Sequence, residues 1–74
     1  MFVELKMKRV EYCVGLFKVA SVKLQKTQNT IVAEDETGKA ELDCSACENA
    51  PSGTTATILG RYENGKVKVM KFEN

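Results

Sequence analysis

The chain has 74 residues, of which 43% are hydrophobic and 28% are charged, and its formal net charge is +1. This composition is typical of one small globular domain: it excludes an intrinsically disordered segment, and no apolar run is long enough to span a membrane. The chain has no histidine, no Gly-rich phosphate loop and no pairing of a nucleophile with a base, so we expect a protein that is not an enzyme and needs no cofactor.

The first predicted strand covers residues 10–24 and follows an irregular lead-in over residues 1–9. Valine, tyrosine, phenylalanine and leucine are frequent in it, and outward and inward positions alternate in both halves. The alternation shifts by one residue near Phe17, and Gly15 lies beside the shift. Because a straight strand of this length would be unusual, we predict a bent or bulged strand.

The next two predicted strands form a hairpin. Residues 30–34 are predicted as a strand, residues 35–38 (DETG) as a turn and residues 39–44 as the returning strand. Gly38 is expected to supply the positive φ of the turn. The inner face of the returning strand is expected to hold Ala40, Leu42 and Cys44.

The C-terminal part supplies the last two predicted strands. Residues 45–53 contain the only proline and are predicted as a loop. Strands are predicted at residues 54–62 and 67–72, and the Asn64-Gly65 pair between them is the strongest short-range signal for a two-residue hairpin. Five short strands without a long helix favour an all-β domain built as a small closed or partly open barrel.

A resemblance to a known family agrees with this architecture. Residues 31–42, IVAEDETGKAEL, resemble the hairpin of strands two and three in OB-fold proteins that bind single-stranded nucleic acid, particularly the small archaeal type related to replication protein A. The most specific element is the DETG turn, and the similarity extends over residues 10–70 through Gly53, Ile58, Gly60, Tyr62, Gly65 and Val67. The resemblance implies a single five-stranded antiparallel Greek-key OB barrel over residues 1–74 that binds single-stranded DNA or RNA.

In that family, aromatic side chains on the outer face of the barrel stack on bases and basic side chains follow the phosphates. Tyr62 lies where the family often has an aromatic residue at the end of strand four, and Phe17 and Phe72 are further stacking candidates. The alternative role of each aromatic is packing in the core or at an end of the barrel.

The candidates for phosphate contacts form a basic rim around the loops at which OB folds bind their ligands. The rim consists of Lys18, Lys26, Arg61, Lys66 and Lys68, with Lys23 and Lys71 as further members. Residues 1–30 carry six basic and two acidic side chains, residues 31–50 one basic and six acidic, and residues 51–74 four basic and two acidic. The two basic ends can meet on one face if the chain closes on itself, and the alternative is a solvated edge that discourages aggregation.

A protein-interaction OB domain is the alternative function, either as a small subunit of a larger complex or as a homo-oligomer. The outward residues of strands two and three are expected to be Val32, Glu34, Glu41 and Asp43. Ser45 occupies a position that is often aromatic in the family. Leu59 and Met70 are expected to point outward on neighbouring strands and to form an apolar patch for such a partner.

The cysteines bear on metal binding and on the compartment. Cys44 and Cys47 have the two-residue spacing of a metal or redox motif, but three cysteines and no histidine do not supply the four ligands of a structural zinc site. We therefore expect no metal site. An odd number of cysteines and the lack of a signal peptide in residues 1–6, MFVELK, favour a cytoplasmic protein.

Overall fold

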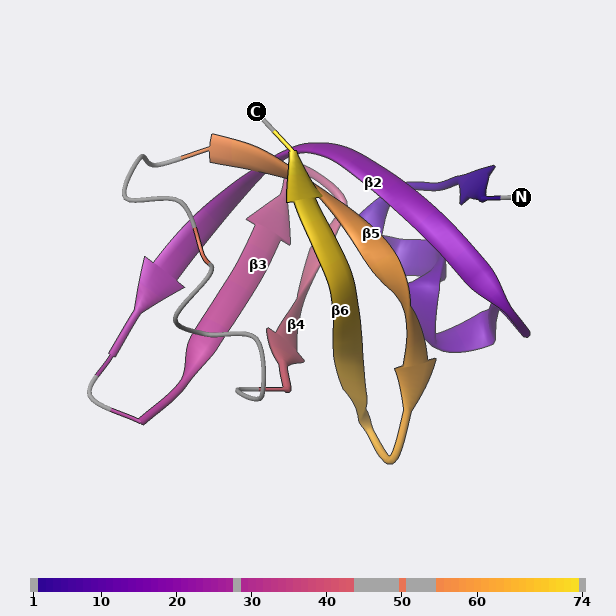
Figure 1. Cartoon of the computed structure of the whole chain (residues 1–74). Coiled ribbons are helices and arrows are strands. Elements are labelled where there is room, and N and C mark those ends of the chain that lie inside the picture. The colour runs from indigo at the N-terminus through magenta and orange to yellow at the C-terminus, as the bar shows by residue number, and fades with distance from the viewer. Residues whose placement is uncertain (1, 28, 44–49, 51–54, 74) are drawn as a thin grey trace.

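β-Strands account for most of the described chain, which comprises residues 2–27, 29–43, 50 and 55–73 of the computed structural model (Figure 1). In chain order the elements are β1 (Val3–Glu4), the 3-10 helix η1 (Met7–Tyr12), β2 (Leu16–Lys26), β3 (Ile31–Asp35), β4 (Gly38–Leu42), β5 (Thr55–Glu63) and β6 (Lys66–Glu73). The strands form a single six-stranded sheet, and the described residues contain no long helix. The prediction of an all-β domain is therefore confirmed.

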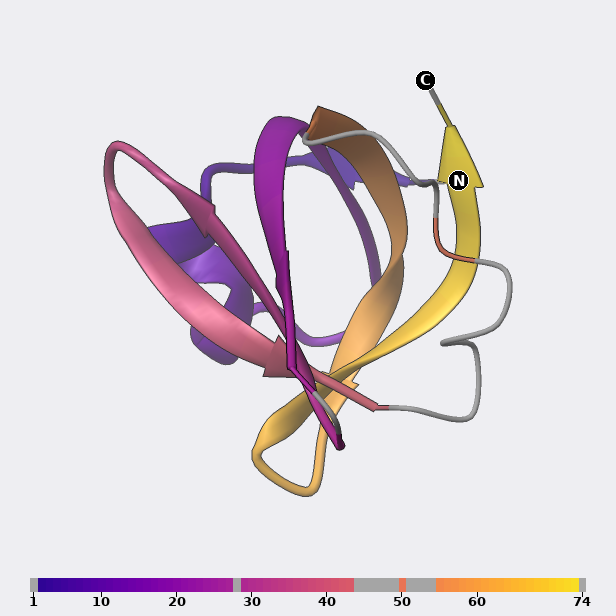
Figure 2. The same ribbon diagram turned by 90° about the vertical axis from the view of Figure 1, so that its left-hand side faces the viewer.

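Five of the six strands pair in a closed ring, because the last strand in the order, β5, also pairs with β2. The strand order is β1-β2-β3-β4-β6-β5, and β2 also pairs with β5. The β1–β2 and β4–β6 pairings are parallel and the others are antiparallel, so the sheet has one strand more than the predicted five and is not wholly antiparallel. The strands accordingly surround one interior, and the β2–β3 and β5–β6 connections lie at the same end, the lower one in Figures 1 and 2.

β2 is bent, as predicted, but at a different place. It pairs with β5 as far as Lys23 and with β3 from Lys23 to its end, and the register on β5 shifts between Val19 and Val22. Both valines are fully buried although they are three positions apart, so the two residues between them form a bulge that returns the strand to its inward-facing alternation. Ser21, in this bulge, lies in the left-handed region at φ 59°. The predicted shift near Phe17 was therefore misplaced by a few residues.

The N-terminal prediction was wrong in one respect, because residues 7–12 form η1 rather than a lead-in followed by the first strand. Met7 and Val10 are buried three residues apart, which matches the three residues per turn of a 3-10 helix. Tyr12 is 75% exposed and Val14 fully exposed, so the alternation around them does not mark a strand. Gly15, at φ 110°, then allows the chain to turn into β2.

Both predicted hairpins are present, with different turn chemistry. In the β5–β6 turn, Asn64 and Gly65 have φ values of 55° and 78°, as the Asn-Gly signal predicts for a type I′ turn. In the β3–β4 turn, Gly38 does not have a positive φ, contrary to expectation. The turn is instead stabilised by the Asp35 carboxylate, which accepts hydrogen bonds from the Thr37 N–H at 2.7 Å and the Gly38 N–H at 3.2 Å.

The core lies inside the ring of strands and is completed by η1. Its buried members are Met7, Val10, Phe17, Val19, Val22, Leu24, Ile31, Ala33, Leu42, Ala56, Ile58, Val67 and Val69. On β4 the expected inward direction of Leu42 is confirmed, and Ala40 packs against the core. Cys44, Ser45, Cys47, Gly53 and the rest of the predicted loop, apart from Ala50, lie outside the described residues.

Candidate functional site

Basic residues from both ends of the sequence meet on the outer side of β2, β5 and β6. Lys18 on β2 is the cross-strand neighbour of Leu59 on β5, and Leu59 is the neighbour of Lys71 on β6. In the next row, Arg61 lies between Leu16 and Lys68. We refer to Lys18, Arg61, Lys68 and Lys71 as the basic face. One cation of the N-terminal basic segment, Lys18, therefore lies beside three cations of the C-terminal segment.

Acidic neighbours partly neutralise the basic face. Glu63 forms ion pairs with two members of the face: Arg61 Nε lies 3.0 Å from Glu63 Oε2, and Lys68 Nζ lies 3.7 Å from Glu63 Oε1. Lys71 pairs with Glu73 at 3.6 Å. Within the described part of the chain, Lys18 is the only member of the face without an ion pair. The paired side chains are well exposed, so each pair is weak and a phosphate group can displace it.

Three other predicted phosphate contacts lie away from the basic face. Lys66 is at the start of β6 and pairs with Glu41 of β4 at 3.4 Å. Lys26 is the last residue of β2, at the opposite end of the strand from Lys18. Lys23, the remaining predicted member, is exposed in the second half of β2, where its register neighbour on β3 is Glu34. The predicted rim is therefore divided into a compact group of four cations and three outlying lysines.

The predicted aromatic residues do not form an outer stacking surface. Phe17 has no exposed surface, because it faces inward opposite Gly60, so it is a core residue and is not available to a base. Phe72 and Tyr62 are half-buried and pack against the core. Leu59, expected to be exposed, is only 8% exposed although it lies outside the core cluster, whereas Met70 is 58% exposed. The predicted Leu59–Met70 patch therefore does not form.

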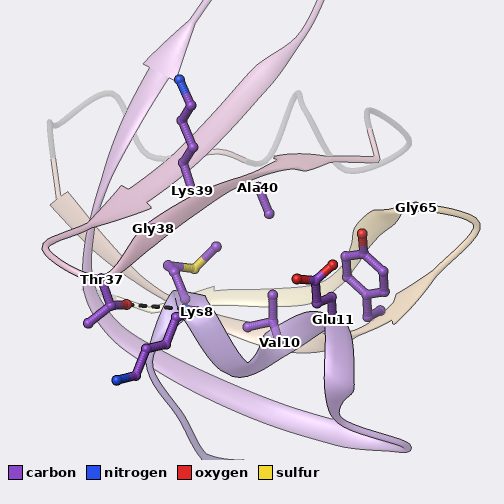
Figure 3. Close-up of a pocket in the computed structure, with 10 residues that line it drawn as sticks. Lys8, Val10, Glu11, Thr37, Gly38, Lys39, Ala40 and Gly65 are labelled. Atoms are coloured by element: carbon purple, nitrogen blue, oxygen red, sulfur yellow. Dashed lines mark hydrogen bonds between the residues drawn. The ribbon is translucent and has the colours of Figure 1, made fainter.

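A groove of about 450 Å³, which we call the end groove, lies between η1, β4 and the β5–β6 turn (Figure 3). Its lining residues are Met7, Lys8, Val10, Glu11, Thr37, Gly38, Lys39, Ala40, Tyr62 and Gly65. Figure 3 shows Glu11 and Ala40 reaching into the groove, whereas the side chains of Lys8 and Lys39 extend away from each other. Sequence reasoning missed this site, apart from Tyr62, because it depends on where η1 lies.

The β3–β4 turn holds η1 in place. Asp35 Oδ2 accepts a hydrogen bond from the Met7 N–H at 3.0 Å, and Thr37 Oγ1 accepts one from the Lys8 N–H at 3.1 Å. Partial burial raises the pKa of the Asp35 carboxyl, but the hydrogen bonds from Thr37, Met7 and Gly38 outweigh it and hold the pKa below its ordinary value. The DETG turn therefore links residues that are 28 positions apart in the sequence.

One edge of β4 faces the groove without a strand partner. Within the described chain, β4 pairs with β6 only at Leu42↔Val67, where the Asp43 N–H donates to the Val67 carbonyl at 2.8 Å. Backbone groups in an antiparallel pair alternate between the two sides of a strand. Since Asp43 directs its N–H away from β3, Lys39 directs its N–H and C=O to the same side, towards the groove.

The described residues contain no group of three or more His, Cys, Asp or Glu side chains arranged to hold a metal ion. Cys13 is a free, half-buried thiol. Within the same residues, no helix has the length and apolar character needed to cross a membrane.

Comparisons of this chain with protein-family models, with curated proteins and with solved structures find no match. The class that the structure itself defines is a small all-β domain with a basic outer face and a groove beside its 3-10 helix.

Proposed function

We propose that the chain is an OB-type module that binds single-stranded nucleic acid on its basic face. The ring of five strands β2-β3-β4-β6-β5, with a long bent strand shared between two partners, supports an OB barrel. The single pairing position between β4 and β6 fits the partly open character of this fold. The β-ring alone does not define a ligand, since OB barrels bind nucleic acids, oligosaccharides and proteins.

The observation that carries the function is the alignment of Lys18, Arg61, Lys68 and Lys71 in adjacent rows. These cations come from segments far apart in the sequence and share one face, as a phosphate backbone requires. Leu16 and Leu59 lie between them in the two rows. Arg61 is followed directly by Tyr62, so a strand that crosses the basic face reaches the end groove at the end of β5.

Binding is expected to weaken steeply with salt. Contacts with four phosphates give a slope of about −3 in a plot of log K against log salt concentration for a single strand. Lys18→Gln, Arg61→Gln and Lys68→Gln should each reduce the slope by about 0.7, because each removes one contact. Fluorescence anisotropy with labelled oligo-dT and oligo-U of about 15 nucleotides measures these slopes, since one OB fold covers at most ~16 nucleotides.

The matched control is Lys6→Gln, because Lys6 is exposed, lies before η1 and pairs with Glu36 at 3.3 Å, away from the basic face. This variant should leave the slope unchanged. If neither oligonucleotide binds at low salt, the proposed function is wrong.

Glu63→Gln should strengthen oligonucleotide binding. The substitution removes the carboxylate that holds Arg61 and Lys68, so both cations become available to phosphates and one repulsive charge disappears. We expect an affinity gain of roughly three- to fivefold at low salt, with a change in unfolding free energy below about 1 kcal/mol. Glu36→Gln, remote from the face, should have no such effect, and equal behaviour of the two variants would argue against the basic face.

A protein-binding role is the second candidate, and it is supported by exposed apolar side chains. Tyr12 is 75% exposed and Val14 is fully exposed, on the connection between η1 and β2. This role predicts a complex or oligomer that persists at high salt and is lost in Tyr12→Ser. Light scattering that shows a monomer at all protein concentrations would exclude the oligomer.

A further inference from the structure

We propose that the end groove binds one nucleobase of the bound strand and prefers guanine. This inference rests on the proposed function, because it assigns base selectivity to a site next to the basic face. The groove volume of about 450 Å³ lies in the lower part of the usual range for small-ligand pockets, ~300–1,000 Å³. It therefore fits a single nucleotide rather than a folded segment.

The walls of the groove suit a flat aromatic ring. Tyr62 is half-buried and packs against the core, so its ring is held in one place. Met7 and Val10 contribute apolar surface from η1, and Ala40 contributes a small side chain from β4. A base that enters between these walls can stack on the Tyr62 ring, as bases do on aromatic side chains in single-strand-binding proteins.

The polar groups at the groove distinguish one base from the others. Glu11 reaches into the groove and makes no ion pair within the described residues (Figure 3). A carboxylate only accepts hydrogen bonds, and its two oxygens can receive two adjacent N–H groups. The Watson–Crick edge of guanine presents such a pair, N1–H and N2–H, whereas adenine, cytosine and uracil or thymine each present donors from one nitrogen there.

The free edge of β4 completes the recognition. Guanine carries the acceptor O6 beside its two donors, and the Lys39 N–H on the unpaired edge of β4 is a donor on the same side of the groove. Lys8 and Lys39 also line the groove and make no ion pair within the described residues, and their side chains extend away from each other (Figure 3), so they can contact the phosphates on either side of the bound base.

The test compares oligo-dT of about 15 nucleotides with the same oligonucleotide carrying one central guanine, adenine or cytosine. We expect the guanine oligonucleotide to bind about tenfold more tightly than the other three. Glu11→Gln should abolish this preference, because the Gln amide offers one acceptor and one donor in place of two acceptors. The same variant should bind oligo-dT at least as tightly as the wild type does, since a negative charge is removed.

The matched control is Glu36→Gln, which changes an exposed carboxylate that pairs with Lys6, does not line the groove and should retain the preference. If oligo-dT binds but one guanine adds nothing, or if Glu11→Gln keeps the preference, the groove inference is wrong while the proposed function stands. If no oligonucleotide binds, the proposed function fails. A titration with guanosine monophosphate alone, followed by NMR shifts of the Lys39 and Ala40 amides, then tests the groove by itself; absence of shifts there would overturn it.

Discussion

Replacing Gly60 with alanine is expected to remove most of the stability of the fold. A Cβ atom at this position would lie 2.2 Å from the Lys68 carbonyl oxygen, 3.1 Å from the Lys68 carbonyl carbon and 3.2 Å from the Val69 Cα. All three are backbone atoms of β6, so no side-chain rotation relieves the clash. Gly60 also faces Phe17 on β2, so β5 cannot move away from β6 without disturbing the core.

The expected loss for Gly60→Ala is about 3 kcal/mol or more, because overpacking here displaces two strands. A chain of this length has a total unfolding free energy on the order of 4–11 kcal/mol, so the variant is expected to be partly or fully unfolded at room temperature. Urea unfolding followed by circular dichroism measures the loss. Gly65→Ala is the control: it has φ 78° but no atom within 4 Å of its Cβ, and should cost only about 1–2 kcal/mol. Similar stabilities of the two variants would contradict the argument.

The hairpins could be predicted from the sequence because their chemistry is local. Asn64 and Gly65 favour positive φ by themselves, so the turn type and the Glu63↔Lys66 pairing follow from two residues. Asp35 likewise stabilises its own turn through Thr37 and Gly38. Around such turns the predicted bounds of β3, β5 and β6 differ from the observed ones by one residue.

Bulges and the helix could not be located in the same way. Val69 and Met70, two adjacent apolar residues, interrupt the alternation of residues 66–72, and here Leu59 faces Lys71 while Gly60 faces Val69, so one extra residue lies in β6. The bulge lies beside Gly60, where the backbones of β5 and β6 approach each other closely. In residues 7–12, periods of two and three residues are both compatible with the apolar positions, and only burial of Met7 and Val10 decides between them.

The candidate site was only partly predictable for a related reason. Charge counts indicate that the two ends of the chain are basic, and strand pairing brings one N-terminal cation, Lys18, beside three C-terminal ones. The ion pairs of Glu63 with Arg61 and Lys68, however, depend on a register that the sequence does not specify. Phe17 was misassigned because its direction depends on the position of the bulge in β2.

Substitution of Asp35 is expected to produce the second large effect, through the contact between the β3–β4 turn and η1. Asp35 Oδ1 accepts hydrogen bonds from Thr37 and Gly38, and Oδ2 accepts one from the Met7 N–H. Asp35→Ala removes all of them and should lower the unfolding free energy by about 2–3 kcal/mol at pH 7, because bonds to a charged acceptor are the stronger ones. Thermal or urea unfolding measures the change, and Glu36→Gln, in the same turn but well exposed, should be nearly neutral.

The unfolding free energy of the wild type should also contain a pH-dependent contribution from Asp35 that is absent from the Asp35→Ala variant. Since the pKa of Asp35 is held below 3.8 in the folded protein, the unfolded chain binds the proton more readily there. The carboxylate therefore contributes its full stabilisation above the unfolded pKa, and this contribution is lost as the pH falls through the lower folded pKa. The stability difference between wild type and Asp35→Ala should shrink over this acidic range, and a difference that stays constant would show that the ionised carboxylate is not the stabilising group.

Asp35→Asn distinguishes the contribution of Asp35 to the β3–β4 turn from its contribution to η1. An Asn side chain can keep its oxygen towards Thr37 and Gly38, but its NH2 group then meets the Met7 N–H, donor against donor. The hairpin should persist while η1 loosens, so the Met7 amide should exchange faster with solvent while amides of β3 remain protected. Because η1 forms one wall of the end groove, the same variant should lose the preference for guanine but keep its affinity for oligo-dT. Retention of the preference together with fast exchange at Met7 would mean that η1 does not shape the groove.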